Sequence, residues 1–425
     1  MPSTTSLPGF RDFYPAELAV RSHITSAWRA VARRYGFEEY DGPPLEALDL
    51  YTEKSGEEIV GQLYHFEDKG GRGVALRPEM TPTLARMVGA RAGGLRKPIR
   101  WFSIPQLFRY ERTQRGRLRE HFQWNVDILG EEDIAADAEI LATALDGLRQ
   151  LGLRAEDIVG RYSDRRLLER LLLHAGVPDD RLSDAFAAID KLMREPEERI
   201  RRRLGDAHIP ENVAARVLAL FRLRDLDALI REHGTVPGVR DELDRLAAYR
   251  RHLDDLGVGD FVAFDPTIVR GLAYYTGTVF EIFDRKGELR AICGGGRYDA
   301  LLRAVSGADL PGVGFGMGDV VLAELLADRG LLPAYAAAVD YFIVAVTAQE
   351  RPLQRRIAAR LRARDHSVTY GLRPASVRAQ LKEADARGAR HVVLLGPDEV
   401  AAGVAQLRSM ETGEQSSIAL DELLA

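Results

Sequence analysis

The segment from Phe108 to Gln123 gathers side chains suited to nucleotide chemistry. It carries the closely spaced arginines Arg109, Arg112, Arg115, Arg117 and Arg119. On an extended strand Arg109 and Glu111 project to the same side. A guanidinium there suits a phosphate, and a carboxylate with neighbouring backbone groups suits a base. The alternative is a solvated hairpin whose charges only keep it soluble.

Glu79 and Arg270 are candidate binding groups for charged parts of a substrate. Glu79, in the sequence Leu76-Arg-Pro-Glu-Met-Thr81, could grip a cationic amino group, or could only help to start a helix. Arg270 stands directly before a glycine, which suggests that the backbone is crowded around a charged group. Tyr274 and Tyr275 follow, and two adjacent tyrosines could also be ordinary strand aromatics.

Three successive glycines, Gly294 to Gly296, precede Arg297-Tyr-Asp299. Such a run indicates that a backbone or a ligand approaches closely. A phosphate-binding loop is one possibility, but the Gly-Lys-Ser/Thr of that motif is absent.

The elements that must position these residues follow from hydrophobic spacing. We expect helices at residues 16–35 and 78–91, a hairpin of two short strands at 63–66 and 74–77, and strands at 99–110 and 120–129. Residues 133–256 are predicted to be mostly helical, with a separate helical insert at about 167–256. Strands at 279–283 and 289–292, the glycine-rich stretch 312–318 and a helix at 319–329 follow.

Sequential strands joined by hairpin loops predict an antiparallel sheet flanked by helices, an α+β domain at residues 1–330. A linker at 331–338 leads to residues 339–425, where the order β-α-β-α-β predicts a small α/β domain with largely parallel strands.

The composition is that of an ordinary globular protein, with 46% hydrophobic and 29% charged residues. The net charge of −5 hides basic regions, because Lys and Arg outnumber Asp and Glu between Tyr341 and His391. The single cysteine, Cys293, excludes an intrachain disulfide and disfavours a cysteine-ligated zinc site. With neither a secretory signal nor an apolar run of about 20 residues, we expect a cytoplasmic protein without a membrane partner.

Taken together, these motifs resemble the histidyl-tRNA synthetase family of class II aminoacyl-tRNA synthetases. The resemblance rests on Phe108-Arg-Tyr-Glu-Arg112 with its arginine loop, Arg270-Gly-Leu-Ala-Tyr-Tyr-Thr-Gly-Thr-Val-Phe-Glu281 and Gly294-Gly-Gly-Arg-Tyr-Asp299. It implies a class II catalytic domain and a C-terminal anticodon-binding domain. It also implies a ligase that activates histidine with ATP and Mg²⁺ and transfers it to tRNA(His), with no tightly bound cofactor and no resident metal.

The resemblance also implies individual roles. Glu79 and Thr81 would contact the α-amino group of histidine, Gln123 would lie near its carboxylate, and Asp127 and Tyr275, beside Tyr274, would recognise the imidazole. For ATP, Arg109 would hold the α-phosphate, Glu111 would read the adenine amino group and Arg117 would approach the β- and γ-phosphates. Arg270 would lie over the reacting centre. The basic residues Arg373, Arg378 and Lys382 are expected to contact tRNA, and residues 37–46 are expected at a homodimer interface.

Three positions depart from the pattern of the family. Ala273 replaces the usual aspartate, and His121-Phe122 reverses the usual order. At the end of the last motif, Gly318-Asp-Val-Val321 replaces Gly-Leu-Glu-Arg, so valine stands where the γ-phosphate arginine is usual. Arg115 and Arg117 are candidates to substitute for it.

Two alternatives follow. One is a catalytically silent relative that regulates ATP phosphoribosyltransferase; such relatives typically lack the C-terminal domain. The other is a stand-alone RNA-binding or stress-sensing module, which would have no use for an activation site.

Overall fold

The computed structural model describes residues 4–52, 61–192, 195–269, 275–335 and 338–425. The chain divides into two compact units, Met1–Pro333 and Ala334–Ala425, which are described separately. Within the described ranges no helix is long and apolar enough to cross a membrane.

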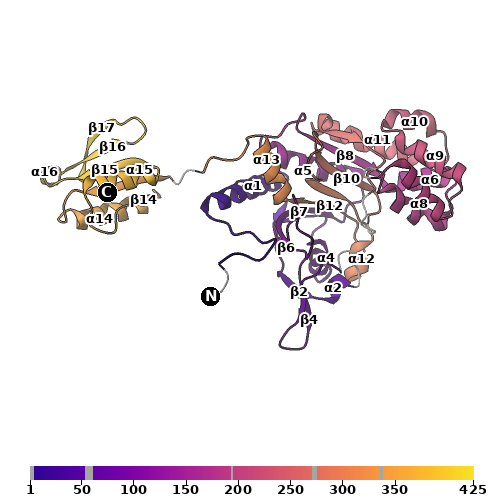
Figure 1. The fold of residues 1–425 in the computed structure, drawn as a ribbon, viewed down its shortest axis with the longest axis horizontal. Helices are drawn as coiled ribbons and strands as arrows, with labels where there is room; N and C mark the ends of the chain where they lie inside the picture. The colour runs from indigo at the N-terminus through magenta and orange to yellow at the C-terminus, as the bar shows by residue number, and fades with distance from the viewer. Residues whose placement is uncertain (1–3, 53–60, 193–194, 270–274, 336–337) are drawn as a thin grey trace. The chain divides into compact units, whose positions relative to one another are not determined.

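A large sheet forms the centre of the first unit (Figure 1). Its strand order is β1-β5-β7-β12-β11-β10-β8-β9, and β6 pairs with β7. The strands are β1 (Glu38–Glu39), β5 (Ile99–Ser103), β6 (Gln106–Phe108), β7 (Glu120–Leu129), β8 (Ile158–Asp164), β9 (Val262–Phe264), β10 (Thr278–Asp284), β11 (Cys293–Arg297) and β12 (Gly312–Gly318). The pairs are antiparallel except β1 with β5 and β8 with β9, so the predicted antiparallel architecture is confirmed for the body of the sheet.

Four strands of this sheet were not predicted. The glycine-rich segments form β11 and β12, β8 lies inside the region expected to be mostly helical, and β9 follows that region. The strand expected at 289–292 is wrong, because the chain there is irregular and pairing begins at Cys293. Glycine has a low strand propensity, and here the pairing with neighbouring strands overrides it.

One face of the sheet is covered by helices α1 (Pro15–Arg34), α5 (Ile134–Arg149) and α13 (Asp319–Asp328). The helix predicted at 16–35 is therefore confirmed. Trp28 of α1 stacks on Trp124 of β7 with ring centroids 5.9 Å apart, and Phe315 of β12 packs edge-on against Trp124. This aromatic cluster forms part of the main hydrophobic core.

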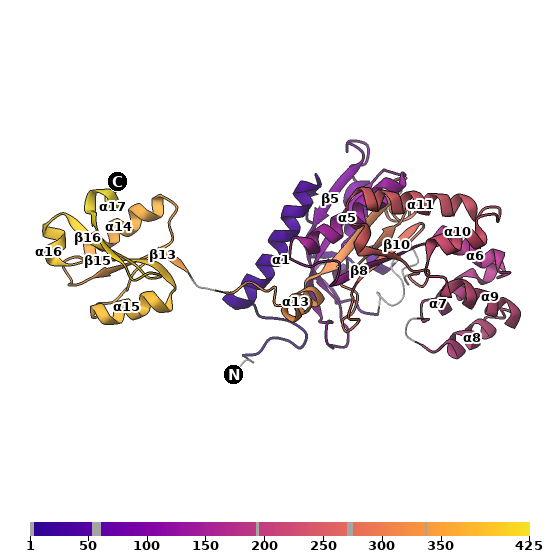
Figure 2. The same ribbon diagram turned by 90° about the horizontal axis from the view of Figure 1, so that it is seen from above.

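The helices that follow β8 form a cluster at one end of the unit (Figures 1 and 2). They are α6 (Arg165–His174), α7 (Leu182–Ile189), α8 (Glu197–Asp206), α9 (Glu211–Arg222), α10 (Leu226–His233) and α11 (Arg240–Asp255). The chain then returns to the sheet through β9. The many Arg–Glu pairs on α8, such as Arg201 with Glu197, are on the surface, as expected for a solvated helix face.

A small sheet of order β2-β4-β3 lies outside the large one. It consists of β2 (Leu45–Ala47), β3 (His65–Glu67) and β4 (Gly73–Leu76), with the short helix α2 (Asp49–Thr52) beside it. Strands β3 and β4 are antiparallel, which confirms the predicted hairpin. Helix α4 (Thr81–Gly89) follows β4 and packs against α12 (Leu301–Ser306).

The second unit contains a sheet of order β14-β13-β15-β16-β17. Its elements are β13 (Val339–Ala345), α14 (Arg351–Ala363), β14 (Val368–Thr369), α15 (Val377–Ala386), β15 (Ala389–Leu395), α16 (Pro397–Ala401), β16 (Val404–Ser409), β17 (Gln415–Ala419) and α17 (Leu420–Leu424). The first three strands are parallel as predicted, whereas β16 and β17 are antiparallel. The short connection from β15 to β16 cannot form a parallel crossover.

Candidate active site

Alternate glycines leave one face of the two central strands without side chains. In β11 and β12 the residues on this face are Gly294, Gly296, Gly312, Gly314, Gly316 and Gly318. Successive residues of a strand point to opposite faces, so these glycines lie side by side. We call this surface the glycine floor. The opposite face is filled, for example by Phe315 and Met317.

Side chains from neighbouring elements lie over the glycine floor. A Cβ atom on Gly314 would be 2.1 Å from Oδ1 of Asp127, and one on Gly316 would be 2.8 Å from Cδ of Gln123. Only glycine fits at these two positions, because the side chains of Asp127 and Gln123 from β7 occupy the space that a Cβ atom would fill.

Tyr275 lies over the β11 part of the floor, beside Gly296. A Cβ on Gly296 would be 2.9 Å from Cδ1 of its ring. The structure thus gathers three residues predicted to bind histidine, and each depends on a glycine beneath it.

Asp127 is the buried carboxylate of this site, with 4% of its surface exposed. Tyr298, from the segment after β11, donates its hydroxyl hydrogen to Oδ1 of Asp127. Burial raises the pKa of Asp127 to about 7, although the Tyr298 hydrogen bond opposes the shift. This carboxyl therefore changes its charge near neutral pH.

Sequence reasoning missed three polar residues near Asp127. Tyr298 was named only as part of its motif. Ser103 of β5 is on the floor side of the sheet, opposite Asn125 in register, and its Oγ is buried, as is the hydroxyl of Tyr40. The charge of Asp127 helps to raise the pKa of Tyr40, which is dominated by burial. The pairing of β5 with β7 would have been needed to place Ser103.

Arg109 links the arginine-rich segment to the residues around Glu79. Its Nε donates to the carbonyl oxygen of Pro78 at 2.9 Å. Glu79 is buried, and Thr81 begins α4 directly afterwards. The predicted amino-group site and the predicted α-phosphate site are therefore adjacent.

The loop after β6 folds back on itself. Glu111 is buried and forms an ion pair with Arg117 at 2.5 Å. A turn at residues 114–117 closes through hydrogen bonds between the backbones of Gln114 and Arg117. Its Gly116 has a φ of +70°, a conformation that favours glycine.

The reversed pair His121-Phe122 is explained by strand alternation. His121 shares the floor side of β7 with Gln123, and its Cδ2 would be 3.9 Å from a Cβ on Gly318. Burial, followed by the charges of Arg109 and Arg11, lowers the pKa of His121 to about 3, so the imidazole is neutral. Phe122 points away and packs edge-on against Phe13.

Asp319, at the start of α13, anchors the end of β12. Its carboxylate accepts a hydrogen bond from the backbone N–H of Phe122 at 2.9 Å and pairs with Nη1 of Arg11 at 3.0 Å. Arg11 also pairs with the buried Glu120 at 2.6 Å. This network connects the N-terminal segment, β7 and α13 at the rim of the floor.

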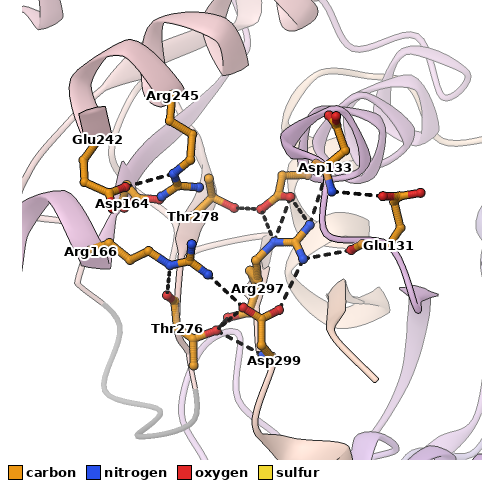
Figure 3. Close-up of polar contacts among 11 residues, drawn as sticks. Glu131, Asp133, Asp164, Arg166, Glu242, Arg245, Thr276, Thr278, Arg297 and Asp299 are labelled. Atoms are coloured by element: carbon orange, nitrogen blue, oxygen red, sulfur yellow. Dashed lines mark hydrogen bonds and ion pairs between the residues drawn. The ribbon is translucent and has the colours of Figure 1, made fainter. Parts of the chain in front are cut away.

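A buried ion pair fixes β11 from below (Figure 3). Arg297, 2% exposed, pairs with the buried Asp137 of α5, with Nε 2.9 Å from Oδ2. Arg297 also donates to the carbonyl oxygen of Glu131 at 2.9 Å and to Asp299 at 3.2 Å. Since Tyr298 lies between Arg297 and Asp299, these contacts fix the partner of Asp127.

In the second unit, Arg373 lines a surface hollow between α14, β14 and α15. The lining residues are Arg362, Thr369, Tyr370, Gly371, Leu372, Arg373, Ala375, Glu383 and Arg387. Leu372 is 84% exposed. The predicted tRNA contacts Arg378 and Lys382 are exposed residues of α15 outside this lining.

Arg270 and Tyr274, predicted over the reacting centre and near the imidazole, lie outside the described residues. In the part of the chain that is described, no three His, Cys, Asp or Glu residues cluster as metal ligands.

Comparison with known proteins covers both units. The sequence profile described as "Histidyl-tRNA synthetase" matches residues 9–319, and the profile described as "Anticodon binding domain" matches residues 340–425. The histidine–tRNA ligase of Opitutus terrae is 44% identical over 431 residues, covering 100% of this chain and 98% of its own length.

Two further proteins resemble this chain over nearly its whole length. The chloroplastic/mitochondrial histidine–tRNA ligase of Arabidopsis thaliana is 39% identical, covering 98% of this chain and 85% of its own length. The crystal structure of histidyl-tRNA synthetase from Nostoc sp. PCC 7120 has the same fold, with a TM-score of 0.83 at 23% identity, covering 100% of this chain and 98% of its own. The profile match and the near full-length relatives show that this chain belongs to the histidyl-tRNA synthetase family.

Proposed function

We propose that the glycine floor is where this histidine–tRNA ligase activates histidine with ATP. The observation that carries the proposal is the convergence of Asp127, Gln123 and Tyr275 over the floor. A buried carboxylate and a tyrosine can satisfy the two imidazole nitrogens. A site built on such hydrogen bonds rejects amino acids that lack them.

The α-amino and phosphate groups are assigned to the adjacent segment. Glu79 and Thr81 bind the ammonium group, and Gln123 lies near the carboxylate. Arg109, hydrogen-bonded to Pro78, is placed to hold the α-phosphate of ATP next to that carboxylate. Glu111 reads the adenine and Arg117 lies near the outer phosphates, once ATP displaces their mutual ion pair.

The reaction joins two anions, so cations must neutralise the charge as it builds. The histidine carboxylate oxygen attacks the α-phosphorus, the bond to the bridging oxygen breaks, and pyrophosphate leaves. A terminal ribose hydroxyl of tRNA then attacks the acyl carbon and releases AMP. Arg109 and Arg270 stabilise the first step, and Mg²⁺ enters with ATP as part of the substrate.

The wider assignments extend this proposal. Residues 1–330, including the insert at 167–256, form the catalytic domain, and residues 339–425 bind the anticodon region of tRNA(His). The protein acts as a homodimer with residues 37–46 at the interface, and it works in the cytoplasm.

Exchange of labelled pyrophosphate into ATP tests the activation step. Purified protein with Mg²⁺ should catalyse exchange with histidine and with no other amino acid of a panel, because only histidine satisfies Asp127 and Tyr275. Histidine binding without exchange would instead identify a catalytically silent regulatory relative.

The affinity for histidine should depend on the charge of Asp127. The pKa of Asp127 is raised to about 7, so the carboxylate that accepts the imidazole N–H forms as pH rises through that value. Binding measured by titration calorimetry should therefore strengthen above about pH 7 and weaken below it. Asp127→Asn should bind histidine roughly 10- to 100-fold more weakly at about pH 8.

Two variants separate this effect from the titration of free histidine. Asp127→Asn should retain only the dependence due to histidine itself. Tyr298→Phe removes the hydrogen bond that lowers the pKa of Asp127. The midpoint of the pH dependence of histidine binding should therefore shift to higher pH in this variant. An identical pH profile in wild type and Asp127→Asn would contradict the role of Asp127.

Replacing Arg373, Arg378 and Lys382 together by alanine should weaken binding of tRNA(His) and reduce its salt dependence. The salt slope should fall by about one for each phosphate that the protein no longer neutralises. Filter binding at several salt concentrations measures this, and pyrophosphate exchange should be unchanged. Unaltered tRNA affinity would refute the assignment.

A further inference from the structure

The rim of the glycine floor at α13 carries an uncharged side chain at the position where the resemblance to the family predicts an arginine for ATP. Val321 lies in the first turn of α13, three residues after the floor strand β12 ends at Gly318. It is 9% exposed and belongs to the main core. The outer phosphates of ATP carry several negative charges, and a valine cannot neutralise them.

The turn of the arginine-rich loop packs directly against Val321. A Cβ on Gly116 would lie 3.2 Å from Cγ2 of Val321. The turn is held there by Glu324, one helical turn further along α13. Its carboxylate accepts the backbone N–H of Gly116 at 3.1 Å and pairs with Arg115 at 3.2 Å.

The two arginines of this loop that could replace a cation at position 321 are bound to carboxylates. Arg115 contacts Glu324 and Asp328 on α13, which draws its charge away from the floor. Arg117 pairs with Glu111. Once ATP releases Arg117 from Glu111, this arginine brings one positive charge to phosphates that carry several negative ones. A second cation from another element is therefore needed.

Arg290 reaches the same place from the connection between β10 and β11. Its Cδ lies 3.9 Å from the Cβ position of Gly116, the point that Val321 also flanks. The residue is exposed, so a ligand has access to its side chain. An arginine side chain beside Val321 can direct its guanidinium to an anion at this rim.

We propose that Arg290 binds the outer phosphates of ATP, supplying the positive charge that Val321 cannot. The inference rests on the proposed activation of histidine with ATP. Glu324 acts with it as a positioning residue, because it holds the turn at Gly116 against Val321 and beside Arg290. The motif arginine is thus replaced by one from a different loop.

Pyrophosphate exchange at varied ATP concentration tests the proposal on the full-length protein. Arg290→Ala should raise the KM for ATP roughly 10- to 100-fold, the change expected when one charged hydrogen bond is removed. The KM for histidine should stay unchanged. Lys286→Ala, an exposed cation of the same connection, is the matched control and should leave both values unchanged.

Binding measurements locate the interaction on the phosphates. Arg290→Ala should bind ATP more weakly and keep its affinity for AMP, which lacks the outer phosphates. Arg290→Lys keeps the charge and should recover part of the ATP affinity, which excludes a folding defect as the cause. Installing Val321→Arg in the Arg290→Ala protein should lower the KM for ATP again.

The outcomes are distinguishable. Absence of exchange in the wild-type protein would refute the proposed function itself. Wild-type exchange with an unchanged KM for ATP in Arg290→Ala would overturn the role of Arg290 alone, as would equal decreases in affinity for ATP and AMP.

Discussion

The site depends on a steric constraint, the absence of side chains from one face of β11 and β12. Glycines on the floor make room for Asp127, Gln123 and Tyr275, which would otherwise collide with the sheet. On the other face, Gly295 lies where a Cβ would be 2.4 Å from the carbonyl oxygen of Gly314. The floor therefore lies in the centre of a closely packed sheet.

So many glycines weaken a strand, because glycine loses much conformational freedom on folding and has no side chain to pack. Two features offset this cost. The aromatic cluster of Trp28, Trp124 and Phe315 fills the opposite face. The pair Arg297–Asp137 ties β11 to α5, and removing one partner of such a buried pair typically costs about 3–5 kcal/mol. The rigid packing under the floor lets its strands keep a glycine face on which Asp127, Gln123 and Tyr275 can lie.

Much of the fold follows from the sequence, since α1, the β3–β4 hairpin and β7 have regular hydrophobic spacing. Strands β11 and β12 could not be predicted in this way. A strand of alternating glycines shows no side-chain pattern, and its conformation is fixed by neighbours distant in sequence. Gln123, Asp127 and Tyr275 were named because of the resemblance, whereas Tyr298 and Arg290 required the pairing of strands and the approach of loops. Arg270 and Tyr274 stay predictions.

The substitution Gly316→Ala tests most directly the claim that histidine binds at the glycine floor. The added methyl would lie 2.8 Å from the side chain of Gln123 and meet no backbone atom among its nearest neighbours, so the fold should persist while the binding space is filled. Titration calorimetry should show histidine binding to the wild-type protein and to Gly205→Ala, whose Cβ would enter open space, and at least about tenfold weaker binding to Gly316→Ala. Histidine binding by a folded Gly316→Ala protein at wild-type affinity would contradict the account.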